Sequence, residues 1–96
     1  MQTSVRRYRV TGRVQGVGFR GFVESRARML GIEGWVRNRG YGSVEVLAAG
    51  SEEQLGALRS ALDEGPRGAR VEAVREEVQA GDGEELMGFR VEGTVR

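Results

Sequence analysis

Cysteine, histidine and lysine are absent from this 96-residue chain, and long apolar runs are missing as well. The absence of cysteine and histidine excludes a thiol nucleophile, a disulfide, a Cys/His zinc site and a histidine general base. No stretch approaches the roughly 18 apolar residues of a membrane-spanning helix, and the N-terminus has no apolar signal region. We therefore expect a cytoplasmic protein without a membrane segment and without a bound metal, and we expect it to act as a monomer.

The charges nearly cancel. Fifteen arginines face 14 acidic residues, which gives a formal net charge of +1. A chain with so little net charge has no overall field that would draw it to nucleic acid or to a membrane surface. A length of 96 residues suits one domain, residues 1–96, with a core large enough to need no metal or disulfide.

Apolar residues follow strand and helix periods in alternation. Tyr8 and Val10 share one face of an expected strand, whereas Arg7, Arg9 and Arg13 share the other. Ser51 and Gln54 form a capping-box pattern at the start of a helix. The expected elements in chain order are a strand at 6–14, a helix at 20–30 ended by Gly31, strands at 35–39 and 43–49 around a turn at Gly40-Tyr41-Gly42, a helix from 51 to Gly65-Pro66, a strand at 69–78 and a short strand at 89–95.

Two helices among these strands can cover only one face of a sheet. The order predicts an α+β, two-layer sandwich of the ferredoxin-like kind (βαββαβ), with a mainly antiparallel sheet and a short C-terminal strand. We expect Phe19 and Trp35 in the core, and we interpret Arg37 and Arg39 as solvated strand charges.

The residues between the first strand and the first helix carry the clearest functional signal. Gln15, Gly16, Val17, Gly18 and Phe19 lead directly to Arg20. Glycines let successive backbone N–H groups turn into one concavity, and a helix N-terminus adds free N–H groups and a positive dipole end. The planar guanidinium of Arg20 suits two oxygens of one phosphoryl group. These residues predict a cradle for a small dianion.

Asn38 lies at the end of the next strand, which we expect to approach the same edge of the sheet. Its carboxamide has a donor and an acceptor and can hold a water in a fixed orientation. An anion cradle beside such an amide suits phosphoryl transfer by positioning and charge stabilisation, without a metal, a cofactor or an acid/base pair. The carboxylate that leaves an acyl phosphate needs no protonation, so acyl phosphates fit this site.

The same residues resemble a known family. Residues 10–20 (VTGRVQGVGFR) are similar to the first acylphosphatase signature, and Gly34-Trp35-Val36-Arg37-Asn38 with Gly42, Val44 and Gly50 is similar to the second. The resemblance runs from about residue 6 to residue 78. It implies that the backbone N–H groups of residues 15–20 and the Arg20 guanidinium bind the phosphoryl group, and that Asn38 orients the attacking water. It also implies an acyl phosphate substrate and inorganic phosphate as product and inhibitor. The C-terminal stretch lacks the aromatic ending that many members have.

Three other functions compete with hydrolysis as explanations of these motifs. Gly16 to Gly21 matches G-x-G-x-x-G, but the following strand ends without the acidic residue of a dinucleotide site, and the chain is too short for the doubly wound sheet. An RNA-binding module has the same element order but displays aromatic residues on its middle strands, and 43–47 has none. A non-catalytic, phosphate-binding regulatory domain remains the main alternative, because sequence alone does not separate binding from turnover.

Overall fold

The computed structural model describes residues 3–40 and 42–96. The described elements are β1 (Ser4–Arg13), α1 (Phe19–Leu30), β2 (Glu33–Arg39), β3 (Ser43–Gly50), α2 (Glu52–Glu64), β4 (Arg70–Gln79) and β5 (Phe89–Val91). The part of the expected turn that falls on Tyr41 lies outside the described residues. Neither described helix is long and apolar enough to cross a membrane.

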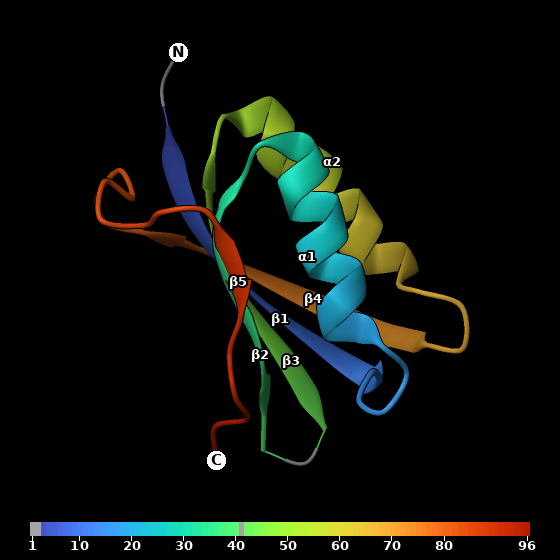
Figure 1. The fold of residues 1–96 in the computed structure, drawn as a ribbon. Helices are drawn as coiled ribbons and strands as arrows, with labels where there is room; N and C mark the ends of the chain where they lie inside the picture. The colour runs from blue at the N-terminus through green and yellow to red at the C-terminus, as the bar shows by residue number, and fades with distance from the viewer. Residues whose placement is uncertain (1–2, 41) are drawn as a thin grey trace.

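The strands form one twisted sheet in the order β4-β1-β3-β2-β5. Neighbours run antiparallel except β2 and β5, which are parallel. Both helices lie side by side on one face of the sheet, as Figure 1 shows. The predicted ferredoxin-like α+β sandwich is therefore confirmed.

The core fills the space between the helices and the sheet. The strands contribute Tyr8, Val10, Val36, Val44 and Val46, all with no exposed surface. The helices contribute the apolar stripes Phe19, Val23, Ala27 and Leu55, Leu58, Leu62. Phe19 is 2% exposed, so its predicted place in the core is confirmed, and it anchors the first turn of α1.

Both helices end where the sequence predicts. Gly31 closes α1 in the left-handed conformation (φ 75°), which a residue with a Cβ rarely adopts. At the start of α2, the Ser51 side chain accepts a hydrogen bond from the Gln54 amide, and the Gln54 side chain accepts one from the Ser51 amide. The predicted capping box is confirmed, and α2 ends at Gly65 as expected.

The strand bounds differ from the expected ones at their ends. Strand β1 stops at Arg13, and Val14, expected within it, starts the loop with its side chain buried. The final strand is shorter than expected and stops at Val91; beyond it the chain keeps separate hydrogen bonds to β2 and one isolated bridge between Arg39 and Val95, without a continuous ladder.

The helix-free face of the sheet holds a buried carboxylate. Glu45, in the central strand, is fully buried and forms ion pairs with Arg37 (2.7 Å), Arg39 (3.4 Å) and Arg7 (3.4 Å). Burial alone would raise the pKa of Glu45, but the hydrogen bond from Arg37 and the three guanidinium charges outweigh it and hold that pKa below its ordinary value.

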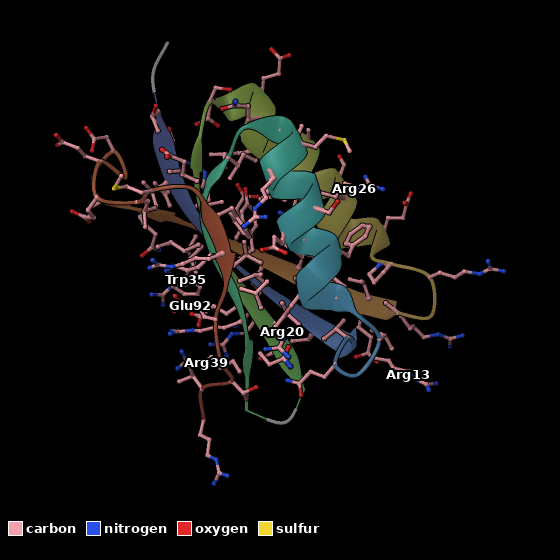
Figure 2. All side chains as sticks on the ribbon, in the orientation of Figure 1. Arg13, Arg20, Arg26, Trp35, Arg39 and Glu92 are labelled. Atoms are coloured by element: carbon pink, nitrogen blue, oxygen red, sulfur yellow. The ribbon has the colours of Figure 1, made fainter. Side chains whose placement is uncertain are left out.

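Two predictions on this face are therefore wrong. Arg37 and Arg39 are not simply solvated charges, because both pair with Glu45. Trp35 does not join the core between the layers: its register position opposite Leu47 places it on the helix-free face, where the Arg37 guanidinium lies 4.3 Å from its ring centroid. Figure 2 shows Trp35 and Arg39 on the side of the sheet away from the helices.

Candidate functional site

A pocket of ≈ 340 Å³ lies where the loop after β1, the start of α1 and the edge of the sheet meet. It is lined by Val14, Gly16, Gly18, Phe19, Arg20, Gly21, Asn38 and Val91. Arg20 is the one charged side chain among these lining residues. The structure thus brings Arg20 and Asn38, which are 18 positions apart in the chain, to one cavity together with two glycines of the loop and one of α1.

The backbone of the loop is open toward an incoming ligand. Gly16 (φ 75°) and Gly18 (φ 76°) are both in the left-handed region, which explains why glycine stands at these positions. A Cβ at either position would meet no atom within 4 Å. Among the described residues, no amide from Gln15 to Phe19 donates to a backbone carbonyl. These N–H groups are available to an anion.

The N-terminus of α1 has no internal partner for its positive dipole end. Gly18 is the N-cap residue, no side chain caps the helix, and the first turn contains no acidic residue. The first N–H groups of a helix lack intrahelical acceptors. In α1 they are left to solvent or to a ligand in the pocket.

Arg20 is held by a neutral group. Its Nη1 donates to the backbone carbonyl of Glu92 at 3.1 Å. No ion pair of Arg20 with a carboxylate is found in the described chain. The carbonyl fixes the guanidinium without neutralising it, so its full charge and its remaining N–H groups can serve a bound anion. Figure 2 shows Arg20 at the base of α1, on the helix side of the sheet.

Asn38 is fixed through its backbone. Its carbonyl accepts a hydrogen bond from the Val95 amide (2.9 Å), and the neighbouring Gly40 amide donates to the Val95 carbonyl (2.7 Å). On β2 the positions of Gly34, Val36 and Asn38 face the helix layer, because successive residues of a strand point to opposite sides. Asn38 therefore reaches the pocket, whereas Arg37 and Arg39 on either side of it face away.

Two of the predicted loop residues do not line the pocket. Val17 is half-buried and packs against the core. The Gln15 side chain turns toward the β2–β3 connection, where its Nε2 donates to the Ser43 carbonyl (2.8 Å) and to the Gly40 carbonyl (3.4 Å). Gln15 thus ties the glycine loop to the hairpin that carries Asn38, a role that its position in the sequence did not indicate.

The C-terminal segment is the part of the site that sequence reasoning missed. The Glu92 carbonyl holds Arg20, and the Val95 amide holds the backbone of Asn38. A further bond from the Glu92 amide to the Val36 carbonyl (2.8 Å) aligns the segment with β2. These are backbone contacts, which any residue except proline could make, so no residue type marks them in the sequence.

Metal-binding chemistry has no candidate ligands at this pocket. The residues that the structure describes contain no group of three or more histidine, cysteine, aspartate or glutamate side chains that could hold a metal ion. The lining offers backbone N–H groups, one guanidinium and one carboxamide, which is a donor set for an anion and not for a cation.

The family model and the relatives by sequence agree on one family. The acylphosphatase family model matches residues 6–91. An acylphosphatase of Koribacter versatilis is 56% identical over 89 residues, which cover 93% of this chain and 80% of that relative. An acylphosphatase of Salinibacter ruber is 52% identical over 84 residues, or 86% of each chain. The crystal structure of acylphosphatase from Bacillus subtilis superposes with a TM-score of 0.87 at 36% identity and covers 92% of this chain and 97% of its own.

Proposed function

The chain belongs to the acylphosphatase family and is an enzyme that hydrolyses acyl phosphates, and we propose that Arg20 and the amides of residues 15–20 bind the phosphoryl group while Asn38 orients the attacking water. The observation that carries this assignment is the pocket that Arg20, the glycine loop and Asn38 line together. The other described helix, α2, begins with a complete capping box, so the start of α1 is the uncapped one of the two.

The phosphoryl group binds where positive charge is already concentrated. Its oxygens accept hydrogen bonds from the loop amides and from the free side of the Arg20 guanidinium, at the positive end of α1. These donors do not move during the reaction, because the loop ends are anchored by the buried side chains of Val14 and Phe19. Donors fixed in advance stabilise the charge that builds up on the phosphoryl oxygens in the transition state.

Asn38 supplies the geometry for the nucleophile. Its carboxamide oxygen accepts one hydrogen bond from a water, which leaves a lone pair of the water directed at phosphorus. The new bond joins the water oxygen to phosphorus, and the bond from phosphorus to the acyl oxygen breaks with its electron pair on the carboxylate. The proton of the water passes to a phosphoryl oxygen of the substrate. No side chain needs to act as a general base.

Inorganic phosphate, the product, has the same oxygens and binds in the same cradle. It therefore acts as a competitive inhibitor. We propose, as the sequence predicts, that the enzyme works as a monomer in the cytoplasm.

The direct test follows the loss of a synthetic aromatic acyl phosphate with increasing inorganic phosphate, in buffer that contains excess chelator. Turnover with competitive inhibition is the expected result. Binding of phosphate without turnover would identify a non-catalytic phosphate-binding domain. Loss of activity in chelator that Mg²⁺ restores would contradict the metal-free site.

The Asn38→Ala variant separates the two halves of the site. Removing the carboxamide takes away the group that orients the water, so kcat should fall by about two orders of magnitude, which is the range for a lost positioning contact. The inhibition constant for inorganic phosphate should stay within about twofold, because the donors of the cradle are unchanged. Wild-type turnover in a folded Asn38→Ala protein would remove Asn38 from the mechanism.

A further inference from the structure

The helix-free face of the sheet contains a second group of arginines, away from the phosphate pocket. Arg9 of β1 lies directly opposite Arg75 of β4 in the antiparallel register. Like charges at directly opposite positions of a sheet destabilise each other. Within residues 3–40 and 42–96, neither guanidinium forms an ion pair or a side-chain hydrogen bond.

The neighbouring carboxylates are already engaged. Glu45 is directly opposite Arg9 on the other side, yet its two oxygens are used by Arg7, Arg37 and Arg39. Glu76 pairs with Arg59 (2.7 Å) and Arg6 (3.3 Å). The remaining carboxylate of this region is Glu77, opposite Arg7 in the register, and no ion pair of Glu77 is recorded in the described chain. Arg9 and Arg75 thus repel each other without a fixed counter-charge.

A hollow lies over this pair. Its volume is ≈ 570 Å³, and it is lined by Arg7, Arg9, Arg75, Glu76 and Glu77. Volumes of about 300–1,000 Å³ are typical of small-molecule sites. The hollow is larger than the phosphate pocket at ≈ 340 Å³. It therefore has room for an anion with more than one charged group.

From the register, the engaged carboxylates and the hollow, we propose that Arg7, Arg9 and Arg75 form a second anion site that binds a ligand with neighbouring phosphate groups. Guanidinium forks pair with phosphate oxygens in bidentate geometry, and Arg9 and Arg75 have no carboxylate partner in the described part of the chain. The Nε of Arg7 faces Glu45, which leaves its terminal N–H groups for a further phosphate, so the three side chains favour a chain of phosphates over a single one. Inorganic oligophosphate and the phosphate tail of a nucleotide share this chemistry. Glu77 also lines the hollow, and its negative charge lowers the affinity for an anion.

The test measures tripolyphosphate binding by calorimetry at constant ionic strength. The Arg20→Ala variant removes the main cation of the phosphate pocket, so the binding that remains reports the second site. We expect this variant to retain one tripolyphosphate per chain. Adding Arg9→Ala and Arg75→Ala should weaken the remaining binding by about tenfold or more. Glu77→Gln should strengthen it by about threefold, since one like charge leaves the rim.

Arg26→Ala is the matched control. It removes the same charge from α1, in the helix layer on the other side of the sheet (Figure 2), and should leave the binding unchanged. A second arm compares ATP with tripolyphosphate: much tighter binding of ATP identifies a nucleotide site, and equal binding an inorganic oligophosphate site. Citrate that binds as tightly would contradict selectivity for phosphate.

The proposal is overturned if Arg20→Ala abolishes all binding or if Arg26→Ala weakens it as much as the Arg9 and Arg75 changes. Its failure is distinguishable from a failure of the proposed function, because turnover of acyl phosphate depends on the other pocket. The Arg9→Ala/Arg75→Ala protein should keep wild-type kcat, which also shows that it is folded.

Discussion

The two helices begin in opposite ways. The N-terminus of α2 has a complete capping box from Ser51 and Gln54, with Glu52 and Glu53 in its first turn. The N-terminus of α1 has a glycine cap, no side-chain hydrogen bond and no acidic residue in its first turn. The same free N–H groups and the same dipole are present in both helices. In α2 the chain satisfies them itself, and in α1 no described side chain does, which supports the proposal that they bind the phosphoryl group.

This difference between the two helix starts indicates the position of the anion site, whereas the large number of arginines does not. Fifteen arginines are spread over the chain. Several, such as Arg37 and Arg59, are paired with carboxylates, whereas Arg20 has a carbonyl as its partner. The position of Arg20 beside an uncapped helix start, without a carboxylate partner among the described residues, supports the proposal that it binds the phosphoryl group.

The largest effect is expected from Arg20→Ala. The variant should lose two to three orders of magnitude in kcat/KM, about 3–4 kcal/mol of transition-state stabilisation, because the cradle keeps only its neutral donors. Steady-state kinetics on an aromatic acyl phosphate provides the measurement. Arg37→Ala is the control, since Arg37 faces the other side of the sheet, and its kcat/KM should stay near that of the wild type. Comparable losses in the two variants would mean that the pocket is not the reaction site.

A smaller effect is expected when an acidic residue is introduced into the first turn of α1, where α2 already has two. Gly21 is in the first turn of α1, lines the pocket and has open space around a built Cβ. Gly21→Asp should weaken phosphate binding by about tenfold, because the negative charge of its carboxylate repels the phosphate bound in the same pocket. It should also stabilise the fold by about 0.5 kcal/mol through the helix dipole and the loss of a helical glycine.

Gly21→Ala separates charge from bulk. It shares the gain in helix propensity but adds no charge, so phosphate inhibition should stay within about twofold of the wild type. Denaturant unfolding and inhibition by inorganic phosphate, measured on both variants, check the two halves of this prediction. Equal losses of phosphate affinity in Gly21→Asp and Gly21→Ala would show that the defect is steric.

The smallest effect is expected from removing the cap of α2. Ser51→Ala loses the hydrogen bond to the Gln54 amide (3.1 Å), and the free energy of unfolding should fall by about 1 kcal/mol. Because this helix start is remote from the pocket lining, kcat and KM should not change. Thermal unfolding and kinetics on the same preparation test it. A change in kcat with unaltered stability would show that α2 has a functional role.

The sequence predicts those features that depend on neighbouring residues. Strand alternation, the Ser51–Gln54 cap and the glycine loop ending at Arg20 are all visible within a few positions, because turn, cap and helix preferences act locally. Asn38 could be placed near Arg20 only through the expected fold, and the structure does bring both residues to one pocket.

Contacts between distant backbone atoms were beyond sequence reasoning. The Glu92 carbonyl is 72 positions from Arg20, and a carbonyl has no residue type that would mark it. Burial of Glu45 was missed for another reason. A glutamate that alternates with valines in a strand indicates a solvent-facing position, and only the register shows that long arginine side chains from β1 and β2 cover it.

The proposed site depends on the C-terminal segment, which lies at an edge of the sheet. Strand β5 has three residues and pairs only with β2. Short edge elements open at a lower free energy than the core does. When this segment detaches, Arg20 loses the Glu92 carbonyl and Asn38 loses the Val95 amide in the same event. On warming, inactivation should therefore begin below the midpoint of global unfolding, so that the enzyme stops working while the other four strands and both helices are still in place.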